Sequence, residues 1–236
     1  MQVYIGTAGW GIASVYADAF PGPGTHLARY ARHLNAVEIN SSFYRPHQRK
    51  TYERWAASVP DGFRFSVKLP RHITHTLRLQ DFREPLTRFL EEAAGLGEKL
   101  AVILVQLPPS LGYDARNAEA LFRALRDQSR AAVACEPRHA GWFTPAADAL
   151  LRASRVARVA ADPARAVKDG EPGGWPGLRY WRLHGSPKIY YSDYDAAALS
   201  SLAARLEPSD WCIFDNTAAF AALGNALSLK ALAARR

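Results

Sequence analysis

The sequence predicts an α/β fold, a single (β/α)8 barrel domain over residues 1–236, and three observations support this prediction. Short apolar runs alternate with segments of helical spacing, which is typical of parallel strands joined by helices. The apolar runs number eight, as a closed barrel requires, and the chain of 236 residues is close to the roughly 250 that are usual. Seven of these runs end abruptly in polar residues, as expected of strands that together form one polar mouth.

The strands are expected where β-branched and aromatic residues form short runs. In chain order these runs are Val3–Thr7, Val37–Asn40, Arg64–Lys68, Ala101–Gln106, Ala132–Glu136, Ala157–Ala161, Leu178–His184 and Trp211–Asp215. No long Ser-, Pro- or Gly-rich linker divides them, which favours one domain.

Helices are expected between the strands, where apolar residues recur at helical spacing. The segments are Thr25–Leu34, Gln48–Val59, Phe82–Leu96, Ala115–Ser129, Pro145–Arg155, Ala196–Leu206 and Ala218–Ala234. Thr25, Asp114 and Thr144 stand at N-cap positions, and Gly95 or Gly97 is placed to end the third helix. The sixth βα unit is expected to be irregular, because residues 162–175 are rich in Pro and Gly and lack a helical pattern.

Composition narrows the class of protein. A hydrophobic content of 48% supports a large core, and no apolar run approaches the roughly 20 residues that span a bilayer. We therefore expect a cytoplasmic protein with no membrane partner. Cys135 and Cys212 are the only cysteines, and each is expected in a buried strand rather than in a disulfide or metal cluster. The net charge of +8 favours anionic partners, but the arginines are scattered, so nucleic acid is possible without being indicated.

Strand periodicity predicts which side chains point to the barrel axis. Residues two apart share a face, so Arg182 and His184 are expected inside with Tyr180. The same rule directs further charged side chains inward at other strand ends, namely Glu38, Lys68 and Glu136. Two interpretations remain open for these residues together with Asp215: a functional site, or a structural salt-bridge network that closes the top of the barrel. An open hollow beside the charges would distinguish them.

Seven motifs in order resemble the YecE-like family of TIM-barrel proteins, also described as domain of unknown function 72. They are GTAGW (6–10), VEINSSFYRP (37–46), FSVKLPRHITH (65–75), VQLPPS (105–110), EPRHAGW (136–142), RLHG (182–185) and FDNT (214–217), the last followed by Asn225 and Ala226. The resemblance covers nearly the whole chain and implies a (β/α) barrel, but no established activity. The chain departs from the family pattern at Ala140 and Gly141, where a Ser is common before the Trp. Its short sixth loop also makes a role for Asp162 beyond turning or capping doubtful.

The candidate catalytic residues are Glu38, Glu136, His184 and Asp215. Glu38 and Glu136 are the best pair for acid and base catalysis, because two carboxylates in different fields acquire different pKa values. His184 is suited to move a proton, and Asp215 to orient a hydroxyl group.

The candidate substrate-binding residues fall into three groups. The cations that match a phosphate or carboxylate are Lys68, Arg138 and Arg182. The amides are Asn40 and Asn216, and the aromatic rim is expected from Trp10, Tyr44 and Trp142, with Tyr190 and Tyr191. His72 and His75 are expected to have surface or hydrogen-bonding roles.

These residues predict an enzyme, an isomerase or epimerase or a hydrolase, that acts without a cofactor on a small anionic sugar or sugar-phosphate-like substrate. One alternative is a metal-dependent phosphodiesterase or endonuclease, with a divalent metal held by Glu136, Asp215 and His184 and a contribution from Asp162. The other is a non-catalytic module that binds nucleic acid or a ligand. The chain has no P-loop and no GxGxxG sequence, which argues against a nucleoside triphosphate or dinucleotide cofactor.

Overall fold

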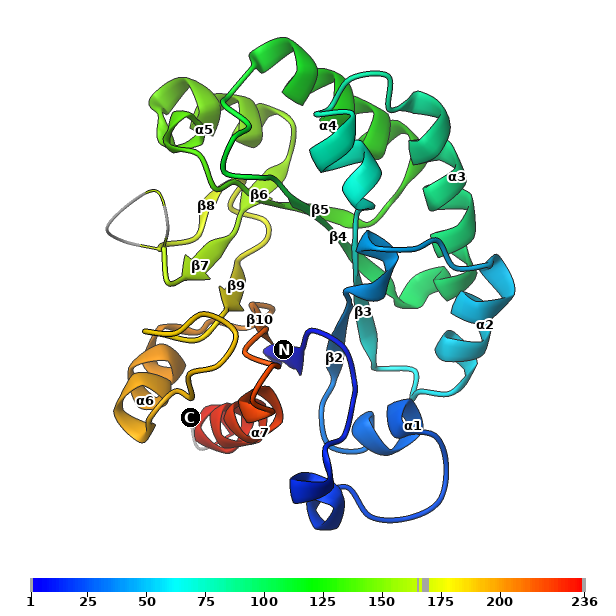
Figure 1. The fold of residues 1–236 in the computed structure, drawn as a ribbon, viewed down its shortest axis with the longest axis vertical. Helices are drawn as coiled ribbons and strands as arrows, with labels where there is room; N and C mark the ends of the chain where they lie inside the picture. Colours follow the sequence, from blue (N-terminus) through cyan, green and yellow to red (C-terminus); the bar gives the residue numbers. More distant parts are fainter. Residues whose placement is uncertain (1, 165, 167–169, 235–236) are drawn as a thin grey trace.

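The strands form the ring of a (β/α) barrel, as the sequence predicts. The computed structural model describes residues 2–164, 166 and 170–234. Within these ranges the strands are β1 (Tyr4–Thr7), β2 (Ala36–Ile39), β3 (Arg64–Lys68), β4 (Leu100–Gln106), β5 (Ala132–Glu136), β6 (Val156–Arg158), β7 (Ala160–Asp162), β8 (Gly173–Gly174), β9 (Tyr180–Leu183) and β10 (Trp211–Phe214). Figure 1 looks into the ring, with the helices outside it.

The ring is continuous through its sixth strand, which is divided into β6 and β7. One sheet has the order β2-β3-β4-β5-β6-β8, and the other has the order β1-β10-β9-β7. β6 pairs with β5, whereas β7 pairs with β9. Val159, between the two halves, still donates its N–H to the Cys135 carbonyl at 2.9 Å. The sixth strand therefore belongs to both sheets and joins them.

The ring closes between β1 and β2 mainly through side chains. The parallel bridge here involves only Ala8 and Glu38. Below it, the Tyr30 hydroxyl accepts from the Thr7 N–H at 2.9 Å and donates to the Ala36 carbonyl at 2.9 Å. A Cβ on Gly6 would lie 2.0 Å from that carbonyl oxygen, so the close approach of the two strands requires glycine.

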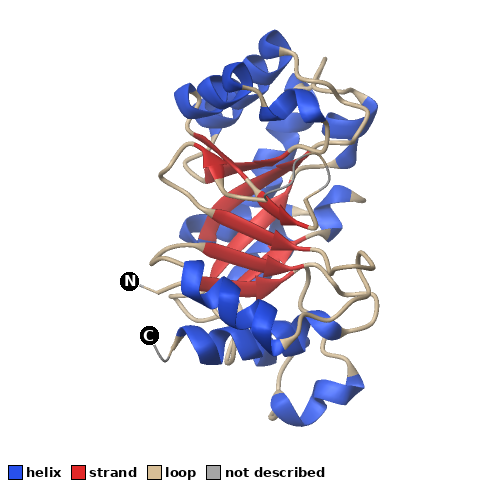
Figure 2. Ribbon diagram, turned by 90° about the vertical axis from the view of Figure 1, so that its left-hand side faces the viewer, coloured by secondary structure: helices blue, strands red, loops and turns tan. Residues whose placement is uncertain are grey.

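Helices cover the outside of the ring, and Figure 2 shows them on both sides of the central strands. They are α1 (His26–Tyr30), α2 (Arg49–Ala57), α3 (Arg83–Ala93), α4 (Ala115–Gln128), α5 (Pro145–Ala153), α6 (Ala196–Arg205) and α7 (Ala221–Ala233). Thr25, Asp114 and Thr144 accept the capping hydrogen bonds expected of them, from the N–H groups of Ala28, Asn117 and Ala147. None of the helices in the described ranges combines the length and the apolar character needed to cross a membrane.

Short helical turns follow several strands and shape the mouth. They are Ser14–Ala19, Ser41–Phe43, His72–Thr76 and Ala140–Phe143, of which His72–Thr76 is a π-helical turn. A further turn, Ala94–Lys99, follows α3 and leads into β4 instead. The third α-helix ends at Ala93, and the turn after it contains Gly97 with φ 55°, a left-handed conformation that favours glycine. Ser41–Phe43 and His72–Thr76 follow β2 and β3, so they lie on the edge where the polar strand ends converge.

The sixth βα unit is irregular, as predicted. β8 pairs antiparallel with β6, and no α-helix is present between β7 and β9 in the residues described there. Residues 165 and 167–169 of this loop lie outside the described part of the chain.

The interior of the barrel changes from aromatic to charged along its axis. Tyr4, Trp211 and Tyr180 are register partners on neighbouring strands, and their rings stack with centroid separations of 5.1 and 5.8 Å. Arg182 lies two residues beyond Tyr180 on the same face of β9. The aromatic layer thus fills the lower barrel and leaves the charged side chains at the carboxyl end of the strands. Cys135 and Cys212 are buried and free, as expected.

Candidate functional site at the mouth of the barrel

Arg182 is the centre of the charge network at the mouth. The side chain is completely buried on β9, and it is paired with three carboxylates. Nε and Nη2 bind the two oxygens of Glu38 at 3.0 and 2.7 Å, and Nη1 donates to Glu136 at 2.9 Å. Nη2 also lies 3.0 Å from Asp215 Oδ2. Side chains from β2, β5 and the end of β10 are therefore held by one guanidinium.

Glu38 is anchored below this network rather than exposed in the mouth. Its residue exposure is 0%, and the Tyr180 hydroxyl donates to Oε2 at 3.0 Å. The same hydroxyl lies 3.0 Å from Ser66 Oγ on β3. Because both carboxylate oxygens already face Arg182, Glu38 orients the guanidinium and is poorly placed for the acid or base role expected from the sequence.

His184 bridges two of the carboxylates. Nδ1 lies 3.0 Å from Asp215 Oδ2, and Nε2 lies 3.2 Å from Glu136 Oε1. Burial alone would lower the pKa of His184, but the charge of Glu136 and the hydrogen bonds to both carboxylates raise it above its ordinary value. The two carboxylates therefore favour the imidazolium form, which can donate through both ring nitrogens.

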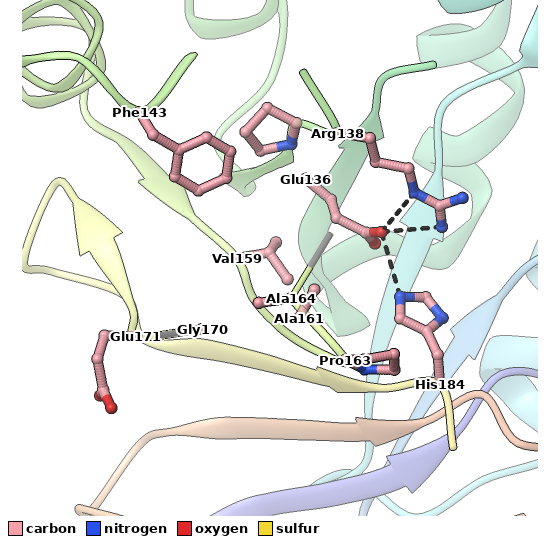
Figure 3. A pocket seen from close by; sticks show the side chains of 11 residues that line it. Glu136, Arg138, Phe143, Val159, Ala161, Pro163, Ala164, Gly170, Glu171 and His184 are labelled. Atoms are coloured by element: carbon pink, nitrogen blue, oxygen red, sulfur yellow. Dashed lines mark hydrogen bonds and ion pairs between the residues drawn. The ribbon is translucent and has the colours of Figure 1, made fainter. Parts of the chain in front are cut away.

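Glu136 stays ionised at the centre of a cationic cluster. Burial would raise its pKa, but Arg182, His184 and Arg138 together hold the pKa well below its usual range. Arg138 reaches Glu136 Oε1 through Nε at 3.0 Å and through Nη2 at 2.9 Å. Figure 3 shows Glu136 between Arg138 and His184, beside a small pocket that the sixth loop lines through Pro163, Ala164 and Glu171.

A larger cavity of about 520 Å³ opens above the network, and we call it the mouth hollow. Basic groups line it, namely Lys68, Arg71, His75 and Arg138. Aromatic rings line it as well, from Phe43, Tyr44, Tyr190 and Tyr191. Its polar walls come from Asn40, Gln106, Asp215 and Thr217. Asp215 is the only carboxylate among the described residues that line it, so the hollow favours an anion.

Two basic groups in the mouth hollow have lowered pKa values. Burial, followed by the charge of Arg182, lowers the pKa of Lys68 to about 8, although three carboxylates act in the opposite direction. Burial and the charges of Arg71, Lys68 and Arg138 lower the pKa of His75 to about 4. His75 is therefore a neutral imidazole at physiological pH, unlike His184.

The structure brings most of the predicted site residues together. Those in the charge network are Glu38, Glu136, Arg138, Arg182, His184 and Asp215. Asn40, Tyr44 and Lys68 line the mouth hollow, together with Arg138 and Asp215. The charges converge, and an open hollow lies beside them, as expected of a functional site.

Three predicted substrate contacts are elsewhere, and these expectations need correction. Trp142 is 1% exposed and donates Nε1 to the Leu111 carbonyl at 3.0 Å, so it belongs to the core. Trp10 packs edge-on against Trp55 with ring centroids 4.9 Å apart, outside the hollow. Asn216 is fully buried and does not line the hollow.

The amide of Asn216 has a structural role. Nδ2 donates to the Ser192 carbonyl at 2.9 Å and to Asn225 Oδ1 at 2.8 Å. These bonds tie the loop after β9 to α7 and position that side of the mouth.

Several lining residues were missed by the sequence reasoning. Arg71 and His75 follow β3, in a stretch whose loop spacing implies no geometry. The sequence predicts a surface or hydrogen-bonding role for His75, and its Nδ1 does lie 2.8 Å from Thr74 Oγ1, but its place in the hollow was not predicted. Phe43 belongs to the turn directly after β2. Gln106 carried a usable signal, because it ends β4 on the same face as the buried Leu104 and Val102.

The metal-binding hypothesis does not fit the donor groups. No group of three or more His, Cys, Asp or Glu residues in the described ranges is arranged to hold a metal ion. Both ring nitrogens of His184 face carboxylates, and Arg182 occupies oxygens of Glu136 and Asp215. Asp162 alternates outward on β7 and lines a different pocket with Trp181 and Leu183, so it does not join the other three.

Comparison with known proteins agrees with the motif pattern. The chain is 34% identical over 88 residues to UPF0759 protein YecE of Escherichia coli K12, a match covering 37% of this chain and 32% of YecE. It is 27% identical over 155 residues to UPF0759 protein YunF of Bacillus subtilis, covering 61% of this chain and 53% of YunF. The matches therefore span about a third and about half of the lengths of these relatives.

Solved structures support the fold. A DUF72 family protein from Enterococcus faecalis V583 superimposes with a TM-score of 0.82 at 21% identity, covering 99% of this chain and 96% of the other. A DUF72 family protein from Thermotoga maritima MSB8 gives a TM-score of 0.75 at 23% identity, covering 98% and 99%. The family described as "Protein of unknown function DUF72" matches residues 4–236. The chain therefore belongs to the DUF72 family.

Proposed function

We propose that the protein is an enzyme that binds a small anionic substrate of the sugar-phosphate or sugar-acid type in the mouth hollow and catalyses proton transfer there. The observation that carries this proposal is an open cavity of about 520 Å³ with basic and aromatic walls and one carboxylate, directly above a buried network of ionised groups. Cavities of this size and composition suit small polar ligands.

Anion recognition is assigned to Arg71 and Arg138. Their guanidinium groups match the geometry of phosphate or carboxylate, and Lys68 adds a third positive charge. The pKa of Arg138 is raised, because Glu136 and Tyr190 outweigh the effect of burial, so this charge is permanent. Tyr44 and Tyr191 are 75% and 49% exposed at the rim, where aromatic rings stack on the apolar faces of sugars.

Proton transfer is assigned to Asp215 and His184. Burial would raise the pKa of Asp215, but Arg182 and His184 lower it, which leaves an ionised base facing the hollow. His184 lies between this carboxylate and Glu136, so its imidazolium is placed to donate a proton while Asp215 accepts one. In this assignment Glu38 is a positioning residue that holds Arg182.

Ligand-dependent thermal stabilisation tests the anion site. Ribose 5-phosphate, gluconate and inorganic phosphate are offered to the wild type, to Arg71→Ala and to Arg116→Ala. Both arginines are exposed, but Arg116 lies on α4 and is not part of the hollow, so it is the matched control. We expect stabilisation of the wild type and of Arg116→Ala, and a loss of about tenfold in affinity in Arg71→Ala, as for the removal of one charge-assisted contact of about 1.4 kcal/mol. Equal responses in the two variants, or none in the wild type, would contradict the proposal.

A second candidate, binding of a longer polyanion such as single-stranded nucleic acid, rests on a neighbouring groove. A cavity of about 370 Å³ shares Tyr44 and Arg71 with the mouth hollow and adds Arg45 and Arg88. Aromatic and basic side chains along a groove are typical of single-strand binding. A steep dependence of DNA binding on salt, weakened in Arg45→Ala, would favour this function over a small substrate.

A further inference from the structure

We propose that Lys68 is a nucleophilic amine that forms an imine with the carbonyl group of an anionic aldehyde or ketone bound in the mouth hollow. This inference rests on the proposed function and specifies its substrate class: a molecule carrying both an acid group and a carbonyl carbon.

The first argument is the isolation of the ammonium group. Lys68 ends β3 with its side chain on the inner face, is 4% exposed and lines the mouth hollow. Within the described part of the chain, its Nζ has no hydrogen bond or ion pair, and it lies over the Phe43 ring, 4.1 Å from the ring centroid. By contrast, Arg182, Arg138 and His184 are each bound to carboxylates.

Such an arrangement is unfavourable for a group with only a structural role. A buried ammonium is normally paired, because its desolvation is otherwise uncompensated. Three carboxylates are nearby, but Arg182 holds all of them. Nζ is consequently directed to the cavity and is free to react with what enters it.

The second argument is the protonation state. With a pKa of about 8, about a tenth of the molecules carry a neutral Lys68 amine at pH 7. An ordinary lysine near 10.4 is neutral in fewer than about one molecule in a thousand. The neutral amine is the form that attacks carbonyl carbon, and desolvation in a cavity is a common means of producing it.

The chemistry balances without a further reagent. The Lys68 nitrogen bonds to the carbonyl carbon, and the C–O bond then breaks. Two protons of the starting ammonium leave with the oxygen as water, and one stays on the iminium nitrogen, so the charge is unchanged. The Phe43 ring that faces the ammonium faces the iminium cation equally well.

Other groups of the hollow fit the steps that follow. Arg71 and Arg138 would hold the acid group of the substrate. His75 is neutral and lines the same cavity, and a neutral imidazole can accept a proton from carbon beside an imine. Asp215 lines the same cavity and, as a negatively charged carboxylate, is a second base there.

Reductive trapping tests the proposal. The wild type is incubated with glycolaldehyde phosphate and cyanoborohydride, and the alkylated lysines are identified by peptide mass spectrometry. Lys50, exposed on α2, is the internal control. We expect alkylation of Lys68 to exceed that of Lys50 by about tenfold or more, because the lowered pKa of Lys68 raises its neutral fraction and the hollow holds the anion beside it. Acetaldehyde, which lacks the anion, should show a smaller preference that reflects the neutral amine alone, and inorganic phosphate should suppress the labelling of Lys68 by glycolaldehyde phosphate.

Thermal stabilisation by glycolaldehyde phosphate, measured without reductant, separates the two proposals. Suppose that glycolaldehyde phosphate stabilises the wild type and Lys68→Arg, but Lys68 is labelled no faster than Lys50. The proposal of an imine is then overturned, and the proposal of an anion site stands. If the compound neither stabilises the protein nor labels Lys68, both proposals fail. Both proposals are supported if Lys68 is labelled selectively and inorganic phosphate suppresses this labelling.

Discussion

Replacing Lys68 by Met should stabilise the folded protein at neutral pH. The pKa of the lysine falls from its ordinary 10.5 to about 8, and one pKa unit corresponds to about 1.4 kcal/mol, so the charged amine costs about 3 kcal/mol of stability below pH 8. Met keeps the apolar stem and removes the charge. Losing the contact between the ammonium and the Phe43 ring offsets about 1 kcal/mol, which leaves a net gain of about 2 kcal/mol.

The advantage of the variant should disappear in alkali. Because the pKa is lowered by folding, the unfolded chain binds more protons than the folded protein between pH 8 and 10.5. The free energy of unfolding of the wild type therefore rises relative to that of Lys68→Met as the pH increases through this window. By pH 10 the difference between Lys68→Met and the wild type should have largely vanished.

Urea unfolding of the wild type, Lys68→Met and Lys50→Met at pH 7 and pH 10 measures both effects. The Lys50 variant controls for the loss of one positive charge at an exposed position. The reasoning is refuted if Lys68→Met is less stable than the wild type at pH 7, or if its advantage is the same at both pH values. Either result would mean that interactions in the folded state offset the desolvation cost of the Lys68 ammonium.

Three further outcomes are expected. Arg182→Ala should lose at least about 3 kcal/mol of stability in urea unfolding, because three buried carboxylates lose their common partner; wild-type stability would show that the carboxylates do not depend on this guanidinium. The raised pKa of His184 should stabilise the fold fully below pH about 6.5, and this contribution should be lost as the pH rises through the folded-state pKa. An NMR titration that finds the imidazole neutral at pH 6.5 would contradict this sign. Trp142→Phe should cost about 1–2 kcal/mol, from the lost bond to the Leu111 carbonyl and the smaller ring, without changing phosphate affinity; a selective loss of affinity would return Trp142 to the binding site.

Much of the fold was predictable because strand periodicity is a local property. The alternation in the run from Tyr180 to His184 assigns Arg182 to the barrel interior, and the structure confirms the convergence of its partners. The Pro- and Gly-rich composition of residues 162–175 likewise predicted the irregular sixth unit. Helix ends were less accurate: the first helix is His26–Tyr30 rather than Thr25–Leu34, because the last residues of that segment turn toward β2.

The site itself depended on distances that local patterns do not contain. Periodicity predicts which face of the strand a side chain occupies. It does not predict how deeply the side chain is buried or which neighbouring group it pairs with. Glu38 and Asp215 both alternate inward, yet one is sealed beneath Arg182 and the other lines the cavity.

The same limit explains Trp142 and Lys68. The sequence places an aromatic residue after β5 and a lysine at the end of β3, and nothing in it shows that the first packs into the core. Nor does it show that Arg182 takes all three carboxylates and leaves the lysine unpaired. The amino-acid order determined the barrel and the gathering of charge at its mouth, because alternation and strand ends are local. Only packing in three dimensions decided which charges neutralise one another and which one faces the cavity, because competition for partners depends on the distances between side chains from different strands.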